Sequence, residues 1–135
     1  MHRYFNLGLI ILFLGCKNEI KPSDLILLNG YWNIEYITHN DETFYPKGAT
    51  NLLDFYEMNE RNGVRKKVQP QLGNKFLVTE DLNNFKITFR GKNCYLNFQT
   101  VWDQWQEKII KLNENRLILE HQEKRYHYKK FHNEH

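Results

Sequence analysis

From residue 30 onward, apolar and polar residues alternate along the chain with a period of two. The clearest case is Phe85, Ile87 and Phe89, which are separated by single polar residues. Successive side chains of a β-strand point to opposite faces, so this pattern gives a strand one apolar and one polar face. About eight or nine such segments follow one another at roughly ten-residue spacing, divided by turn residues. The pattern therefore predicts an antiparallel β-sandwich or barrel.

Residues that favour turns mark where the strands are expected to end. The pair Asn62-Gly63 is predicted to supply the positive-φ positions of a tight hairpin turn. Residues 81–84 are predicted to form another turn, and Pro70 is expected to end or bulge its strand because it lacks an N–H group. Only residues 24–28 are compatible with a helical turn, for which Asp24 is the expected N-cap.

A meander of about eight short strands closes naturally, because closure pairs the two edge strands with each other. The expected fold class is therefore all-β, an antiparallel up-and-down β-barrel of about eight strands. An interior of that size has room for packed side chains or for one small ligand.

The N-terminus has the layout of a secretory signal. A positive start, residues 1–3, precedes an apolar run, residues 4–14, which is too short for a bilayer core that needs roughly 20 residues. Residues 12–17 resemble the lipobox of bacterial lipoproteins, with Gly15 before Cys16. That resemblance implies a signal peptide at residues 1–15, and a diacylglycerol and an acyl chain such as palmitate on Cys16. A conventional signal cleaved elsewhere and a buried N-terminal strand are the alternative interpretations.

The signal sets the expected division of the chain and its location. A polar, lipidated tether is expected at residues 16–24, the barrel at residues 25–131, and a frayed tail at residues 132–135. Two acyl chains make membrane residence stable. The expected location is therefore the cell envelope, anchored by lipid on Cys16 to the outer membrane, facing either the periplasm or the surface.

The start and the end of the expected barrel resemble the lipocalin-like lipoproteins of bacteria, of the small Bacteroidetes type. In that group a short helical segment is followed by Gly, one residue and Trp, and here Gly30 and Trp32 have this spacing. Residues 115–119 and 126–130 resemble the final hairpin of the family. The resemblance implies an up-and-down barrel whose base is closed by Trp32. It implies binding of a small ligand only loosely, since fold does not confer function.

Aromatic residues make up 15% of the chain, and they offer two interpretations. They could line a pocket for a small apolar molecule, or they could simply form the core, where burial of aromatic rings dominates the energy. Trp102 and Trp105 are expected on opposite faces of a strand, so that at least one is exposed and available to a partner or a membrane surface. The candidate lining residues are Trp32, Tyr36, Phe55, Phe85, Phe89, Phe98, Tyr126 and Tyr128.

Charge and composition argue against several functional classes. The formal net charge is +3, with basic and acidic residues mixed, so no single-signed field favours nucleic acid. The basic run at residues 65–67 is interpreted as a solvated strand face. The six histidines have no metal-site spacing, although His121 and His127 could meet on one hairpin. No metal and no cofactor are expected.

No catalytic residue is expected, and the protein is not predicted to be an enzyme. If Cys16 is acylated, Cys94 has no disulfide partner, and its apolar neighbours predict a small buried hydrophobe. No Gly-rich phosphate loop is present. The expected function is that of an envelope lipoprotein that binds a small apolar ligand or has a structural role. The alternative is a protein–protein interaction module, such as an inhibitor, an immunity protein or an envelope-complex subunit, that uses the barrel surface.

Overall fold

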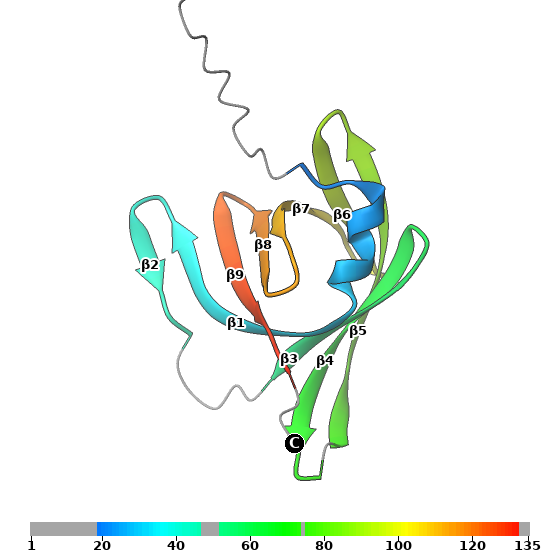
Figure 1. Cartoon of the computed structure of the whole chain (residues 1–135), viewed down its shortest axis with the longest axis vertical. Coiled ribbons are helices and arrows are strands. Elements are labelled where there is room, and N and C mark those ends of the chain that lie inside the picture. Colours follow the sequence, from blue (N-terminus) through cyan, green and yellow to red (C-terminus); the bar gives the residue numbers. More distant parts are fainter. Residues whose placement is uncertain (1–18, 47–51, 74, 133–135) are drawn as a thin grey trace, which may run out of the picture.

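The computed structural model describes residues 19–46, 52–73 and 75–132, so the expected signal and Cys16 lie outside the described residues. No helix in this part of the chain is both long and apolar enough to cross a membrane. The described residues form one 3-10 helix and nine strands (Figure 1): η1 (Pro22–Leu28), β1 (Gly30–His39), β2 (Glu42–Phe44), β3 (Leu53–Asn59), β4 (Asn62–Gln71), β5 (Lys75–Arg90), β6 (Asn93–Gln99), β7 (Gln104–Leu112), β8 (Arg116–His121) and β9 (Lys124–Lys130).

The strands form a closed antiparallel barrel. Their order is β2-β1-β3-β4-β5-β6-β7-β8-β9, and β1 also pairs with β9. Eight strands, β1 and β3 to β9, therefore complete the ring. The short strand β2 lies outside the ring and pairs only with the last residues of β1. The expected fold class, an all-β antiparallel up-and-down barrel of about eight strands, is confirmed. Closure satisfies the backbone groups that open edge strands would expose.

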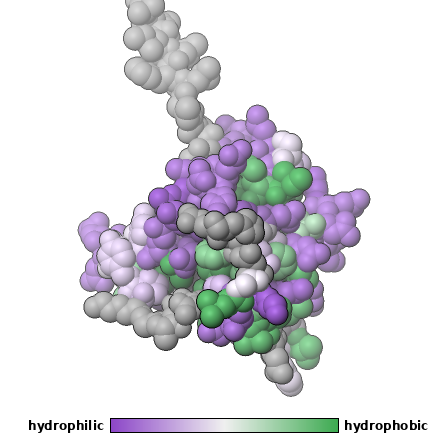
Figure 2. Space-filling model, turned by 60° about the horizontal axis from the view of Figure 1, so that its bottom comes forward, coloured by the Kyte–Doolittle hydropathy of each residue, from purple (hydrophilic) through white to green (hydrophobic). Residues whose placement is uncertain are grey.

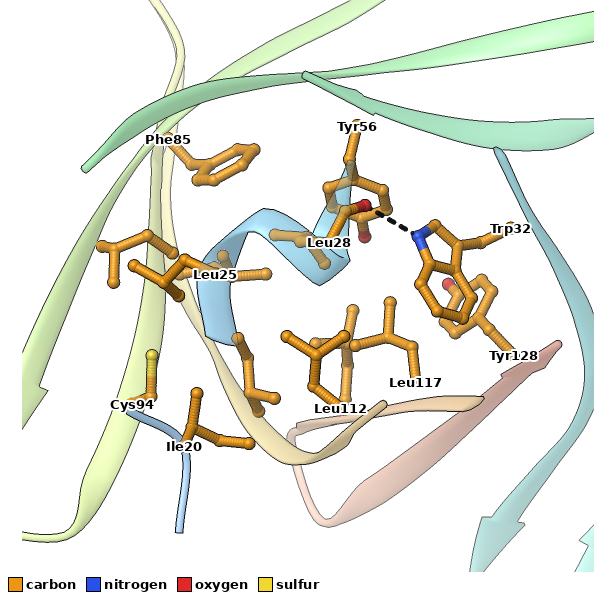
Figure 3. Packing of buried hydrophobic residues seen from close by; sticks show 14 of the residues in the cluster. Ile20, Leu25, Leu28, Trp32, Tyr56, Phe85, Cys94, Leu112, Leu117 and Tyr128 are labelled. Carbon is orange, nitrogen blue, oxygen red and sulfur yellow. Dashed lines mark hydrogen bonds between the residues drawn. The ribbon is translucent and has the colours of Figure 1, made fainter. Parts of the chain in front are cut away.

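The helix closes one end of this barrel from the inside. Figure 3 shows Leu25 and Leu28 pointing into the ring of strands, and both are buried. Ile20 is buried in the same cluster, so the packed structure begins before residue 25, where the sequence placed the start of the barrel. The N-cap residue is Lys21 and not Asp24, the residue that the sequence predicts. Asp24 is the third residue of the helix, and its carboxylate accepts a hydrogen bond from Lys21 N at 2.9 Å.

Trp32 attaches the helix to the barrel wall. Its side chain is 0% exposed, and its indole Nε1 donates a hydrogen bond to Leu28 O at 2.8 Å (Figure 3). The ammonium group of Lys130 lies 4.6 Å from the centre of the Trp32 ring and donates to Asn29 O. Trp32 therefore closes the base, as the family resemblance implied.

The turn between β3 and β4 differs from the sequence prediction. Asn62 and Gly63 belong to β4, and the turn is made by Glu60 and Arg61, with Glu60 at φ 59°. Gly63 is not in the left-handed region. A Cβ at this position would lie 2.4 Å from Cζ of Phe85. The glycine is thus required by the close approach of a buried ring and not by the turn.

The turn predicted at residues 81–84 is absent, because β5 runs through it and stays paired with β4. Leu82 lies opposite Lys66 and Val78 lies opposite Val68, so three residues of β5 stand opposite Lys67 alone. The turn-favouring residues therefore sit beside a bulge, where the irregularity of the ladder accommodates them. Pro70 does not end its strand, since β4 continues to Gln71.

Replacement of Trp32 by Phe is expected to destabilise the protein by about 3 kcal/mol. The change removes the indole N–H that donates to Leu28 O, which costs about 1–3 kcal/mol for a buried group, and leaves a small cavity. Urea unfolding followed by circular dichroism measures the change.

Trp102→Phe is the matched control for this substitution. Trp102 is 93% exposed, so its replacement is expected to change stability by less than about 0.5 kcal/mol. Equal stability of the two variants would show that Trp32 does not hold the helix in the barrel.

Candidate functional site

The inward-facing residues of β4 divide the barrel interior into three levels. Gly63, Arg65 and Lys67 alternate along the strand and face the inside, where they meet different partners. Gly63 lies beneath the Phe85 ring in the closed end. Arg65 forms the middle level with Glu107, and Lys67 forms the third level with Asp54.

The closed end is filled by apolar side chains from the helix and the strands (Figure 3). Cys94 is fully buried among them, which confirms the expectation of a small buried hydrophobe. Burial raises the pKa of the Cys94 thiol to about 11, although Arg61 opposes this effect, so the thiolate nucleophile is suppressed at neutral pH. The strand residues that fill this end are Phe85, Ile87, Leu96, Phe98, Ile109, Leu112, Leu117 and Leu119.

The middle level is a buried ion pair supported by further hydrogen bonds. Arg65 donates from Nη1 and Nη2 to the two oxygens of Glu107, at 2.8 and 2.9 Å. Arg65 Nη1 also donates to Tyr56 Oη at 3.2 Å, and Trp105 Nε1 donates to Glu107 Oε2 at 2.8 Å. The guanidinium carbon lies 4.2 Å from the centre of the Phe98 ring. The pair therefore joins β4 to β7 across the interior.

The electrostatics of this level favour a fixed structural role. The side chains of Arg65 and Glu107 are 14% and 10% exposed. Burial lowers the pKa of Arg65, but Tyr56 and the hydrogen-bonded Glu107 raise it by more, so the guanidinium stays charged. Burial also raises the pKa of the Tyr56 hydroxyl, which stays neutral. A guanidinium and a neutral phenol at this site exchange no proton near neutral pH.

Above this level, the interior opens into a cavity of about 200 Å³. The Trp32 ring contributes to its wall, so the same residue closes the base and borders the cavity. The lining is mostly aliphatic and aromatic, with a single ion pair. The lining residues are Trp32, Ile34, Ile37, Pro46, Leu52, Asp54, Lys67, Tyr126 and Tyr128.

Asp54 and Lys67 are the charged groups of this cavity. Asp54 is 3% exposed, and its Oδ1 forms an ion pair with Lys67 Nζ. Apart from this ammonium group, no hydrogen-bond donor among the described residues reaches Asp54 Oδ1. Burial raises the pKa of the neighbouring Tyr128 well above its usual value, so its hydroxyl is neutral. The cavity thus combines an apolar wall with one carboxylate that can accept a further hydrogen bond.

The structure places the eight aromatic candidates in three environments. Trp32, Tyr126 and Tyr128 line the cavity. Phe85 and Phe98 are buried in the closed end, and Phe89 packs partly buried against the same cluster. The remaining two, Tyr36 and Phe55, are in neither group.

Tyr36 and Phe55 are on the outer surface of the barrel. The pairing of β1 with β9 is irregular between Ile34 and Tyr36, so that Ile34 and Ile37 line the cavity and Tyr36 does not. The Tyr36 ring stacks on His127 at 4.2 Å instead, and the Phe55 ring lies 4.7 Å from that of Tyr31. A strict period of two could not reveal this change of face, because a bulge inserts one extra residue.

Several other sequence expectations can be located in the structure. Trp102 is exposed, as expected for at least one of the two tryptophans, but it lies in the turn before β7 and not on a strand face. Trp105 is on β7 and stacks on Phe98 at 5.0 Å. His121 lies opposite Lys124 and His127 opposite Ile118, so the two histidines are not paired. The described residues hold no group of three or more potential metal ligands.

The basic run at residues 65–67 is not simply a solvated face. Arg65 and Lys67 point inward to buried carboxylates, and Lys66 is the member that faces out. The signal for this arrangement was present in the period-two spacing of Arg65 and Lys67 with Gly63. Glu107 lies 42 positions from Arg65 in the sequence, so that pair could not be inferred from the spacing. Asp54 lies opposite Lys67 in the β3–β4 hairpin, but the predicted turn at Asn62-Gly63 gives a different register.

Several solved structures resemble this chain. A lipocalin-like protein from Bacteroides uniformis has 13% sequence identity and a TM-score of 0.49, over 78% of this chain and 99% of that one. An uncharacterized protein from Bacteroides eggerthii has 7% identity and a TM-score of 0.48, over 77% and 99%. Lobster apocrustacyanin A1 has 12% identity and a TM-score of 0.48, over 84% and 66%.

No family model matches the sequence, and no curated protein matches it. The barrel is established by the strand order of this chain and by the pairing of β1 with β9.

Replacement of Glu107 by Gln is expected to destabilise the protein by about 3 kcal/mol, because it leaves the buried guanidinium of Arg65 without a counter-charge. The control is Glu120→Gln, which removes the more exposed ion pair with Arg125 and is expected to cost less than about 1 kcal/mol. Denaturant unfolding of both variants tests this, and equal losses would contradict a structural role of the buried pair.

Proposed function

We propose that the protein binds a small, largely apolar molecule in the barrel cavity, and that a lipid on Cys16 holds it at the membrane of the cell envelope. The observation that carries the binding proposal is the unequal filling of the barrel. Apolar side chains fill the closed end up to the Arg65–Glu107 pair, whereas about 200 Å³ is open beyond it. Closed eight-stranded barrels have room for one small ligand.

The cavity limits the size and the chemistry of the ligand. Cavities that enclose drug-sized ligands have volumes of roughly 300–1,000 Å³, so the molecule bound here is smaller. The rings of Trp32, Tyr126 and Tyr128 favour an apolar or aromatic body. A hydroxyl group on the ligand can donate to Asp54 Oδ1, which satisfies a buried acceptor. A small phenol meets these requirements.

The ligand proposal predicts that p-cresol, an aromatic ring with one hydroxyl group, binds in the cavity. Saturation-transfer NMR on the full chain is expected to show transfer to p-cresol and none to glycerol, which has hydroxyl groups but no apolar body. Ile37→Trp fills the cavity and is expected to weaken p-cresol binding at least tenfold.

The control is Tyr36→Trp, which adds bulk at the neighbouring position on the outer surface. This variant is expected to bind p-cresol as the wild type does. Absence of transfer to p-cresol, or equal binding by the two tryptophan variants, would refute ligand binding in the cavity.

The anchoring proposal rests on the sequence around Cys16 and on the position of Ile20. Ile20 is buried at the helix end of the barrel, four residues after Cys16. Four extended residues span at most about 14 Å, so a lipid on Cys16 would keep this end close to the membrane. The proposed location is the outer membrane, with the cavity directed away from the bilayer.

Replacement of Cys16 by Ser is expected to move the protein from the membrane fraction to the soluble fraction and to abolish labelling by radioactive palmitate. Cys94→Ala is the control, because Cys94 is buried and is expected to leave both readouts unchanged. Unaltered fractionation of the Cys16→Ser variant would overturn the anchoring proposal.

A second candidate function is a protein–protein interaction module, and the surface of the β4–β5 hairpin favours it. Leu72 is 97% exposed at its turn, and Leu77, Val78 and Leu82 are also exposed along β5. Figure 2, which brings the bottom of the view in Figure 1 forward, shows hydrophobic surface at this end of the molecule. If p-cresol does not bind, this surface becomes the better candidate for the functional site.

A further inference from the structure

The strands that carry the buried rings of Phe85 and Phe98 on their inner face have a large groove on their outer face. The groove has a volume of about 750 Å³ and extends across β4, β5, β6 and β7. This volume falls within the range of sites that bind small molecules. The residues that line it are Asn62, Gly63, Asn84, Phe85, Lys86, Asn97, Phe98, Gln99, Gln104, Trp105 and Gln106.

The alternation along the strands shows which of these residues present side chains to the groove. Phe85 and Phe98 are buried in the core, and a Cβ on Gly63 would point at the Phe85 ring. Their neighbours in sequence therefore face outward. The outward side chains are Asn62, Asn84, Lys86, Asn97, Gln99, Gln104 and Gln106, of which six are amides.

This accumulation of amides is local. Asn is disfavoured in strands, so several of them in adjacent strands call for a reason other than the stability of the sheet. On the opposite side of the barrel, the outward positions of β8 and β9 carry charges, such as Arg116, Glu120, Arg125 and Lys129. The groove thus differs from the ordinary charged surface of the same barrel.

Part of the amide array is held in a fixed arrangement. Asn97 Nδ2 donates to Thr88 Oγ1 at 2.7 Å and to Lys86 O at 3.1 Å. Gln106 Nε2 in turn donates to Asn97 Oδ1 at 2.7 Å. This network leaves Gln106 Oε1 as an acceptor toward the groove. Among the described residues, no hydrogen bond occupies the side-chain amides of Asn84, Gln99 and Gln104, so their donors and acceptors are available to a ligand.

An exposed tryptophan stands next to the groove. The turn between β6 and β7 joins Gln99 to Gln104, and it carries Trp102, which is 93% exposed. Thr100 Oγ1 accepts hydrogen bonds from Trp102 N at 3.2 Å and from Asp103 N at 3.0 Å, which fixes the turn. A second hollow, bordered by Gln99 and Thr100, continues the groove toward this turn.

We propose that this groove binds a neutral saccharide. Each amide offers two donors and an acceptor oxygen, which match the vicinal hydroxyl groups of a sugar. The apolar C–H face of a pyranose ring packs on an aromatic ring. Trp102 does not line the groove itself, but it is exposed in the turn that joins the lining residues Gln99 and Gln104, where a sugar that extends beyond the groove could reach it. Among the described lining residues, Lys86 is the only charged one and six are amides, so hydrogen bonding to neutral hydroxyl groups is expected to outweigh the attraction of one ammonium group for an acid.

Affinity electrophoresis in native gels tests this proposal. The full chain, purified in a detergent without a sugar head group, is run through gels that contain amylopectin, laminarin, yeast mannan or polygalacturonate. At least one of the three neutral polysaccharides is expected to retard the protein, and the acidic polygalacturonate is not. Trp102→Ala and the double variant Gln99→Ala/Gln104→Ala are each expected to weaken the retardation at least tenfold.

Asn33→Ala is the matched control, because Asn33 is an exposed amide on the outer surface of β1, outside the groove. Its retardation is expected to equal that of the wild type. Retardation by none of the neutral polysaccharides, or equal retardation of all variants, would overturn the proposal, as would stronger retardation by polygalacturonate. The cavity-filling variant Ile37→Trp is expected to keep saccharide binding, so this result and the p-cresol result are independent.

Discussion

The bidentate pair of Arg65 and Glu107 is the interaction on which the interior of the barrel depends. A charge that is moved out of water costs several kcal/mol unless it is paired and hydrogen-bonded, and here Tyr56 and Trp105 complete the set of partners. The pair also marks a boundary, because apolar side chains fill the barrel on one side of it and the interior is open on the other. Replacing such a pair by apolar residues is often neutral for stability. We therefore infer that the main effect of the pair is to separate the filled end of the interior from the open cavity.

Much of the fold could be predicted from the sequence, because the hydrophobic pattern is a local property. The period-two segments, repeated at roughly ten-residue spacing, were sufficient to predict an up-and-down barrel. The closed base was implied by the family resemblance that Gly30 and Trp32 carry. The errors occurred where pairing with a neighbouring strand overrides local preference. β5 continues through residues 81–84 because β4 stays paired with it. Gly63 is needed because the Phe85 ring leaves no room for a Cβ, which the rules for turn residues do not consider.

The candidate site was less predictable, since it depends on which face each residue occupies and on partners distant in sequence. The aromatic residues of β9 line the cavity, whereas Tyr36 is outside because of one bulge in β1. Asp54 and Lys67 are 13 positions apart, and only the β3–β4 pairing brings them together. The amide groove arises in the same way, from four strands whose outward residues are individually unremarkable in the sequence.

The central claim is that the barrel is filled up to the Arg65–Glu107 pair and open beyond it. Diffraction from crystals of the protein under xenon pressure tests this directly, because xenon enters apolar cavities of about this size. The account predicts a xenon site beside Trp32, Ile34 and Tyr126, and no xenon between Phe85 and Phe98. A barrel without bound xenon, or with xenon among the residues of the closed end, would contradict it.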